Sequence, residues 1–249
     1  MNHYVETIRI RTKDCDMNGT WRFSAILEEM QEAAGIHSTL LGCGRDQLLR
    51  QGVVWVLIRS EVRMDRYPAA GEEVTVETFH REARHGLFPR YFIMTDAEGN
   101  RIGAASTIWM LMNLETRESA SADSVGVNLP DNRDMTPPIP LPAPIRPLQG
   151  EARQAAYRAV YTDLDVNGHV NNTKYADWIC NQLGEQVLTA QEIGRMILDY
   201  NAEVLPEQDV RFELTREGDS CRMTGWCGEK KSFEIGCTLR PREGAGRRG

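Results

Sequence analysis

The distribution of proline constrains the fold of this chain more than any other feature. Seven of the eleven prolines lie between Pro130 and Pro147, in the stretch "LPDNRDMTPPIPLPAPIRP". Proline has no amide hydrogen and a fixed φ, so this stretch excludes a helix or central strand and favours extended chain. We therefore expect two domains, 1–125 and 150–249, joined by a linker at 126–149. The alternative is a long surface loop.

The two sides of this stretch repeat each other. Residues 16–19 are Asp-Met-Asn-Gly, and residues 165–168 are Asp-Val-Asn-Gly. Each motif follows a short alternating segment and precedes apolar residues spaced three and four apart, which predicts a long helix in each half. The first helix is expected from Ser24 to Leu41, and the second includes Tyr175 and Leu183. The matching order of elements favours duplication over chance.

Strand-like runs follow each predicted helix, divided by turn signals such as "DAEGN" and "REGDS". The runs are "VVWVLIRSEVRM", "EEVTVETF", "RYFIMTD" and "GAASTIWMLMNL", then "AEVLP", "DVRFELTR", "CRMTGWC" and "KSFEIGCTL". A single helix wrapped by an antiparallel sheet is the hotdog arrangement. The expected fold class is therefore α+β, a double hotdog in which each repeat has one long helix wrapped by an antiparallel β-sheet.

Charge, apolar runs and cysteine spacing limit the classes of function that this chain can have. The net charge is -7, which counts against broad nucleic-acid binding because phosphate contacts need a basic surface. The N-terminal residues contain no apolar signal core, and no apolar run approaches a membrane span. The six cysteines have neither CxxC nor metal-ligand spacing, so we expect reduced thiols in a cytoplasmic protein, with no metal and no cofactor.

Polar residues crowd the stretch "DLDVNGHVNNTKYADWI" at 163–179, just before the second predicted helix. Asp165, Asn167 and Gly168 are turn formers, so one interpretation is a plain turn. The other is a site at the N-terminus of the helix, where free backbone N–H groups and a partial positive charge suit a developing oxyanion. His169 and these residues would then surround a carbonyl group.

This stretch resembles the acyl-(acyl carrier protein) thioesterases of plants and bacteria, and "DRYPAAGEEVTVET" at 65–78 is similar to their first half. The resemblance implies a double hotdog that hydrolyses fatty acyl thioesters on acyl carrier protein and releases free fatty acid. It also implies a catalytic set of Asp165, Asn167, His169 and Glu203, with Glu203 on the following strand. Val204 stands where plant members carry a cysteine, which favours water or a carboxylate as the attacking group.

The first half departs from this pattern at one position. It keeps Asp16 and Asn18, but Thr20 stands where His169 stands in the repeat. We therefore expect the first domain to supply the acyl pocket and the second to carry catalysis. Met30, Ala34 and Trp55 are the predicted substrate-binding residues, although each could equally be plain core.

Three functions remain open at this stage. The chain is expected to hydrolyse acyl-carrier-protein thioesters, with acyl-CoA hydrolysis and non-catalytic binding of acyl thioesters as alternatives. The catalytic set counts against the binding module but does not separate the two enzymes. The expected partner is acyl carrier protein bearing a fatty acyl group. We expect no nucleic-acid partner and no membrane span, and a homodimer is a possible assembly.

Overall fold

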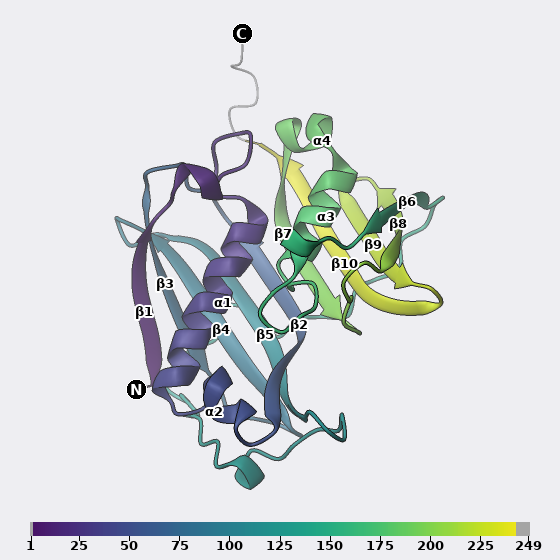
Figure 1. Ribbon diagram of the computed structural model, residues 1–249. Coiled ribbons are helices and arrows are strands. Elements are labelled where there is room, and N and C mark those ends of the chain that lie inside the picture. The colour runs from purple at the N-terminus through teal and green to yellow at the C-terminus, as the bar shows by residue number, and fades with distance from the viewer. Residues whose placement is uncertain (1, 243–249) are drawn as a thin grey trace. The chain divides into compact units, whose positions relative to one another are not determined.

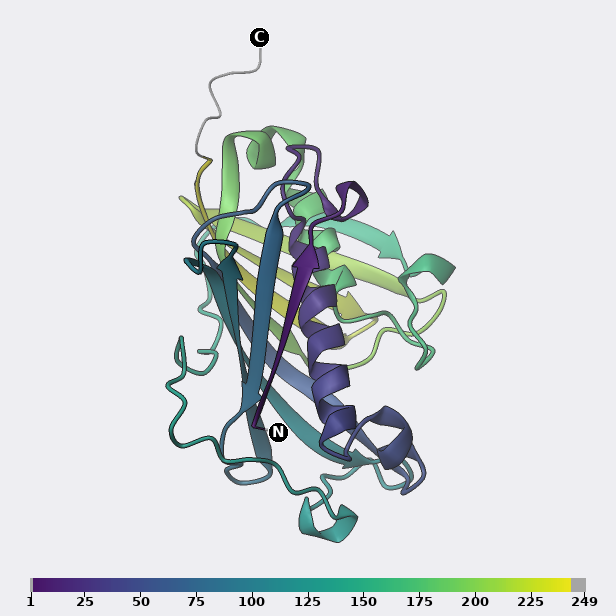
Figure 2. The same cartoon turned by 90° about the vertical axis from the view of Figure 1, so that its left-hand side faces the viewer.

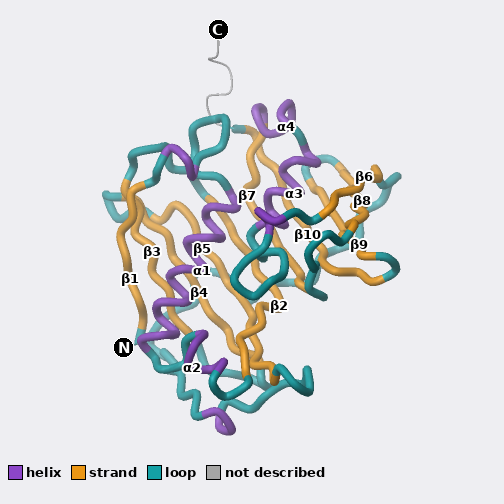
Figure 3. The backbone as a smooth tube through the Cα atoms, viewed as in Figure 1, coloured by secondary structure: helices purple, strands orange, loops and turns teal. Residues whose placement is uncertain are grey.

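The computed structural model describes residues 2–242 and divides into two units, Met1–Pro142 (unit 1) and Ala143–Gly249 (unit 2). In both units most of the regular structure is strand, with few helical segments (Figure 3). Across residues 2–242, no helix is both long enough and apolar enough to cross a membrane.

The described part of unit 1 contains an antiparallel sheet in the order β1-β3-β4-β5-β2. Within this unit the order therefore begins with the N-terminal strand and ends with the second strand (Figure 1). The strands are β1 (His3–Arg9), β2 (Val53–Met64), β3 (Glu73–His80), β4 (Leu87–Asp96) and β5 (Arg101–Asn113). The four runs predicted after the first helix correspond to β2 to β5.

One long helix, α1 (Phe23–Leu40), lies against one face of this sheet (Figure 2). It buries Ile26, Met30, Ala33 and Ala34, which recur at three- and four-residue steps and so form one apolar stripe. Gly42 adopts φ +78 just beyond the last turn, a left-handed conformation that commonly ends helices. The predicted first helix is confirmed to within one residue at each end. A short helix, α2 (Arg45–Leu49), and two single 3-10 turns, η1 (Thr12–Asp14) and η2 (Asp123–Val125), complete the unit.

Unit 2 repeats this topology. Its described strands form an antiparallel sheet in the order β7-β10-β9-β8-β6, so the first strand of the unit again stands at one end of the order and the second at the other. The elements are β6 (Arg153–Arg158), η3 (Tyr161–Asp163), α3 (Lys174–Leu183), α4 (Glu185–Ala190), β7 (Gln191–Tyr200), β8 (Asp209–Glu217), β9 (Ser220–Cys227) and β10 (Lys230–Pro241). Identical strand order supports duplication more strongly than the four-residue sequence match does.

The helix of unit 2 differs from the single long helix expected. α3 is 10 residues long, and α4 follows it as a separate helix of 6 residues. Gly184 lies between them with φ +83, a conformation that residues with a side chain rarely adopt. The apolar spacing predicts the helical face correctly, but the glycine interrupts the helix.

The strand predicted at "AEVLP" is absent, and this expectation was wrong. The residues from 201 to 206 form loop, and the strand lies earlier, at β7. The sequence "QEIGRMILDY" mixes buried and half-buried positions without clean alternation, so it gave no strand signal. Glu203 therefore follows the strand and does not belong to it.

The proline-rich stretch contains neither helix nor strand from residue 126 to residue 149, and it packs onto each unit in turn. On unit 1, Asn132 donates to the carbonyls of Asn2 (2.7 Å) and His80 (2.8 Å), and Ser106 donates to the carbonyl of Pro140 (2.8 Å). On unit 2, Ile145 lies against Gly236, where a Cβ would meet its Cγ2 at 3.0 Å. Much of the stretch is therefore held in place by packing and hydrogen bonds.

The interior of unit 2 is filled with aromatic rings. Tyr175 stacks on Phe233 with ring centroids 4.4 Å apart, and Trp178 lies 5.5 Å from Phe212. Gly225 makes room for this packing, because a Cβ there would lie 2.0 Å from the Phe233 ring. Tyr175 and Trp178 are thus core residues, as the spacing of the helix suggested.

A carboxyl group between α1 and the edge strand β1 makes unit 1 sensitive to pH. Burial, together with the carboxylate of Glu6, raises the pKa of Glu29 to about 7. A group whose folded pKa is raised binds extra protons in the folded state, so the contribution of Glu29 to the free energy of unfolding falls as pH rises from about 4.5 to 7. We expect Glu29→Gln to stabilise the protein at pH 8 by about 1 kcal/mol, allowing for solvent screening, and to have little effect at pH 4. Chemical denaturation at both pH values, with Glu28→Gln as the control, measures this. A gain that is equal at both pH values would contradict it.

Candidate active site

The polar stretch of unit 2 folds into a tight loop from Asp165 to His169. The amide of Asp165 donates to the carbonyl of His169 (3.0 Å), and the amide of Gly168 donates to the carbonyl of Asp165 (3.0 Å). The Asp165 carboxylate also accepts from the amide of Asn167 (2.8 Å), and Gly168 has φ +80. These residues therefore do form a turn, as one of the two interpretations expected. The turn brings Asp165 and His169, at the two ends of the loop, close together.

The loop places the side chains of Asp165 and His169 beside each other. Nδ1 of His169 lies 3.9 Å from Oδ1 of Asp165 and 3.2 Å from the carbonyl oxygen of Val170. The Asp165 contact is too long for a hydrogen bond. Both side chains are partly accessible, at 22% for His169 and 14% for Asp165, so an incoming molecule can reach them.

Unit 1 builds the same loop from Asp16 to Thr20. The amide of Asp16 donates to the carbonyl of Thr20 (2.8 Å), and the amide of Gly19 donates to the carbonyl of Asp16 (3.0 Å). The hydroxyl of Thr20 lies 3.2 Å from the Asp16 carboxylate, in the place that the imidazole takes in unit 2. The first copy therefore keeps the loop but replaces the titratable ring with a hydroxyl.

Backbone bonds extend this correspondence to the loop that carries Glu203. In unit 2 the amide of Val170 donates to the carbonyl of Val204 (2.8 Å). In unit 1 the amide of Trp21 donates to the carbonyl of Pro68 (2.8 Å). Val204 thus matches Pro68, so Glu203 matches Tyr67. The first copy has lost the glutamate as well as the histidine, which the sequence comparison did not reveal.

The structure brings part of the predicted catalytic set together. Asp165, Asn167 and His169 share one loop, and the bond between Val170 and Val204 places the loop of Glu203 directly beside it. Glu203 is exposed, whereas Val204 is fully buried at 0%. A side chain in the position of Val204 points into the core, which does not suit an attacking group.

Helix α3 begins later than the sequence suggested. Its first residue is Lys174, and the intervening turn is fixed by Asn171, whose side chain accepts from the amide (2.9 Å) and the hydroxyl (2.8 Å) of Thr173. The helix N-terminus therefore lies five residues beyond His169. Asn171 therefore fixes the turn that leads into the helix, in keeping with the preference of asparagine for positions at helix N-termini.

Asp163 supports this site and was not predicted. It is 6% exposed, its carboxylate accepts from the Tyr157 hydroxyl (2.8 Å) and the Val160 amide (3.0 Å), and its carbonyl accepts from the Asn171 amide (2.8 Å). In unit 1 the carbonyl of Asp14 accepts in the same way from the backbone amide of Arg22 (2.9 Å). The repeated Asp-x-Asp spacing was the available sequence signal.

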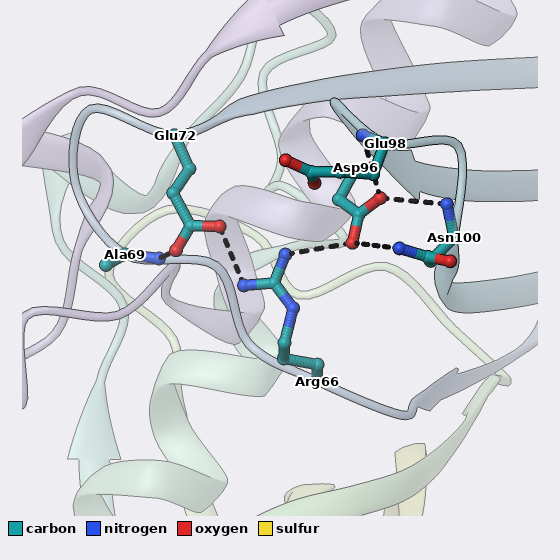
Figure 4. A network of polar contacts seen from close by, with 6 residues as sticks. All are labelled: Arg66, Ala69, Glu72, Asp96, Glu98 and Asn100. Carbon is teal, nitrogen blue, oxygen red and sulfur yellow. Dashed lines mark hydrogen bonds and ion pairs between the residues drawn. The ribbon is translucent and has the colours of Figure 1, made fainter.

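The first-half motif at 65–78 is held by a polar network (Figure 4). Arg66 contacts Glu72 (2.7 Å) and Asp96 (3.5 Å), and Glu72 accepts from the amide of Ala69 (2.6 Å). Asp96 also accepts from the amide of Asn100 (2.8 Å). The network fixes the turn that pairs with the loop at Asp16–Thr20, so the role of this motif in the structure is to position that loop.

The three predicted substrate-binding residues lie in unit 1. Met30 and Ala34 are 4% and 6% exposed, on the face of α1 that covers the sheet. Trp55 packs edge-on against Phe88, with centroids 5.0 Å apart, and donates to the carbonyl of Cys43 (2.9 Å). Trp55 thereby belongs to an apolar cluster at the α2 end of the unit, and packing in this cluster is enough to explain its position.

Within residues 2–242 there is no group of three or more His, Cys, Asp or Glu side chains placed to hold a metal ion. All six cysteines lie in the described residues and are free thiols, with Cys43, Cys221 and Cys237 buried.

Two units of identical topology, each a helix against an antiparallel sheet, define a double hotdog protein. Solved structures share this fold over nearly the whole chain. An acyl-ACP thioesterase from Bacteroides thetaiotaomicron superimposes with a TM-score of 0.88 at 24% identity, covering 96% of this chain and 98% of that one. The 12:0-ACP thioesterase from Umbellularia californica superimposes with a TM-score of 0.82 at 22% identity, covering 96% and 98%.

The chain belongs to the acyl-ACP thioesterase family: residues 1–124 match the N-terminal domain and residues 148–245 match the C-terminal domain. Curated relatives include the palmitoyl-acyl carrier protein thioesterase of Cuphea hookeriana, 26% identical, covering 80% of this chain and 51% of that protein. The oleoyl-acyl carrier protein thioesterase of Coriandrum sativum is 28% identical, covering 85% and 62%. The chain spans about half the length of several of these relatives.

Proposed function

We propose that this chain hydrolyses fatty acyl thioesters of acyl carrier protein to free fatty acid and carrier protein, the step that ends fatty acid synthesis. The observation that carries the proposal is the loop that sets His169 beside Asp165, in a chain that belongs to this family. The equivalent loop of the other repeat has Thr20 in place of the histidine. Unit 2 is proposed to perform the chemistry and unit 1 to bind the acyl chain.

The proposed chemistry needs only a positioned water and a stabilised oxyanion. A thiol is a good leaving group, with a pKa of about 8.5, so strong acid assistance is unnecessary. Water attacks the carbonyl carbon, Asp165 or Glu203 accepts its proton, and His169 orients the carboxylate or relays that proton. Asn167 donates toward the oxyanion or holds the water. The C–S bond then breaks, and the thiolate leaves and takes up a proton.

The division of labour is supported by the difference between the two copies of the loop. Unit 1 has Thr20 and Tyr67 where unit 2 has His169 and Glu203. Met30 and Ala34 are proposed to line the acyl site, with Trp55 near one end. The proposed domains are 1–125 and 150–249, with the proline-rich stretch at 126–149 as the linker.

The direct test is to incubate the protein with a panel of acyl-carrier-protein and acyl-CoA thioesters and to follow thiol release. Release from carrier-protein thioesters supports the proposal, and release from CoA thioesters alone supports the alternative enzyme. Tight binding of acyl thioesters without release would identify a non-catalytic binding protein. We also propose a cytoplasmic location, which the free thiols support, and a homodimer, which sedimentation velocity tests.

We expect a higher kcat/KM for the carrier-protein thioester than for the matching CoA thioester. The carrier is acidic and this chain has a net charge of -7, so docking requires a local basic surface. Such contacts are screened over a Debye length of about 10 Å at 0.1 M salt, so KM for the carrier-protein substrate should rise with salt. Steady-state kinetics at 0.05 and 0.5 M salt measure this. Equal turnover of the two thioesters without a salt effect would exclude the carrier preference.

We expect hydrolysis to persist without cysteine. The three buried cysteines are changed to alanine, and the half-buried Cys15, Cys180 and Cys227 to serine. Because Val204 is buried where plant relatives carry cysteine, the loss in kcat should stay below the ~10² of a catalytic group. Rates of thiol release and circular dichroism are compared with those of the wild type. A folded but inactive variant, or an acyl group trapped on a cysteine of the wild type, would restore a thiol nucleophile.

A further inference from the structure

A row of buried polar residues crosses the sheet of unit 1. His80 on β3 is paired with Arg90 on β4, Arg90 with Thr107 on β5, and Thr107 with Ser60 on β2. Residues paired across adjacent strands point to the same face of a sheet, so the four side chains form one line. We call His80, Arg90, Thr107 and Ser60 the polar belt.

The polar belt lies on the face that α1 covers. The guanidinium of Arg90 donates to the hydroxyl of Ser38 (3.0 Å) and contacts Nδ1 of His37 (3.2 Å), both on the last turns of the helix. The four belt residues are only 1–2% exposed. The rows on either side of the belt are mostly apolar: Phe92, Ala105 and Val62 with the polar Thr78 on one side, and Phe88, Trp109 and Leu57 on the other.

Three members of the belt have partners within the chain. Arg90 also contacts Thr78 (3.1 Å) and His80, and Thr107 accepts from the Trp109 indole (2.9 Å) and donates to the carbonyl of Arg90 (3.2 Å). The hydroxyl of Ser60 is buried without a hydrogen-bond partner among the described residues, and Nδ1 of His80, at the other end of the belt, is likewise without one. A buried polar group without a partner is unfavourable, and most such groups in proteins are satisfied.

We propose that Ser60 and the polar belt bind a hydroxyl group carried on the acyl chain, so that the preferred substrates are thioesters of hydroxylated acyl chains. This inference rests on the proposed function and specifies its substrate class. A hydroxyl of Ser60 both donates and accepts, and so can pair with an alcohol of the ligand. A plain alkyl chain along the same face leaves Ser60 unpaired and lies against the guanidinium of Arg90.

Discrimination by such a site is strong, because a site built to pair with a substrate hydroxyl rejects the analogue that lacks it. The position of the hydroxyl along the chain is found by scanning positional isomers of one chain length. The experiment measures kcat/KM for hydroxyacyl-carrier-protein thioesters and for the unsubstituted thioester of equal length. One isomer is expected to exceed the unsubstituted chain at least tenfold, the scale of a buried polar contact.

The variant Ser60→Ala should abolish this advantage, so that kcat/KM becomes equal for the hydroxylated and the unsubstituted chain, because it removes the hydroxyl proposed to pair with the substrate. Ser232→Ala is the matched control, since Ser232 of unit 2 is 1% exposed and its hydroxyl is likewise without a partner. The control should keep the advantage of the hydroxylated chain.

Two results would overturn the inference. In one, no isomer exceeds the unsubstituted chain, which indicates that buried water alone satisfies the belt. In the other, Ser60→Ala keeps the full advantage, which places the recognition elsewhere. Failure of the proposed function is distinct, since the wild type would then release thiol from neither the plain nor the hydroxylated thioesters.

Discussion

Replacing His169 with alanine is expected to lower kcat for thioester hydrolysis by ~10² to 10⁴ while the protein remains folded, because a positioned general acid or base contributes about that factor. His169 is partly accessible and its only short side-chain contact in the described residues is to a backbone carbonyl, so its loss removes little packing. Asp165→Asn and Glu203→Gln should each lose a similar factor. Asn167→Ala should lose roughly 10² to 10³ if its amide stabilises the oxyanion.

The duplicated loop supplies a matched control for these variants. Thr20→Ala removes a hydroxyl that lies 3.2 Å from Asp16, in the place equivalent to His169. It should cost about 1 kcal/mol of stability and leave kcat unchanged. Single-turnover rates with carrier-protein thioesters and urea denaturation separate the two effects. A His169→Ala variant with wild-type kcat, or a Thr20→Ala variant that loses activity as severely, would reverse the assignment of the catalytic unit.

The second large effect is expected on stability, from Arg90→Ala. Burial lowers the pKa of Arg90 to about 9, so the side chain remains a buried cation at neutral pH. Among the described residues its guanidinium bonds to the side chains of His37, Ser38, Thr78 and His80, and none of these partners is a carboxylate. Leaving a buried polar group without its partner costs about 1–3 kcal/mol. Four groups depend on this guanidinium, so the free energy of unfolding should fall by about 3 kcal/mol or more.

Urea denaturation of Arg90→Ala at neutral pH measures this loss. Arg101→Ala is the control, because Arg101 is half-exposed and contacts the exposed Asp65 at 3.3 Å, and such pairs contribute about 0–1 kcal/mol. Burial, with Arg90 and His37 nearby, also lowers the pKa of His80 well below its usual range. Because His80 stays neutral in the folded state, its contribution to the free energy of unfolding falls as pH drops below about 6.5, and this contribution opposes that of Glu29. A loss for Arg90→Ala no larger than that of Arg101→Ala would show that the cluster is not a structural support.

Local patterns in the sequence predicted those helices and strands whose apolar residues recur regularly along one face. The apolar spacing from Ser24 to Leu41 predicted α1, and the runs after it predicted β2 to β5. The repeated Asp-x-Asn-Gly motif predicted two copies of one loop, and the hotdog fold and the family are confirmed. These predictions succeed because periodicity and turn chemistry act within a few residues.

Only the tertiary structure decided which distant residues meet. The match of Glu203 with Tyr67 depends on backbone bonds from Val170 and Trp21 to loops far along the chain. The polar belt depends on the register of β2 to β5, and a shift of one residue would point its side chains to the other face. No local pattern specifies register across strands, because register is set by the packing of all strands and the helix together.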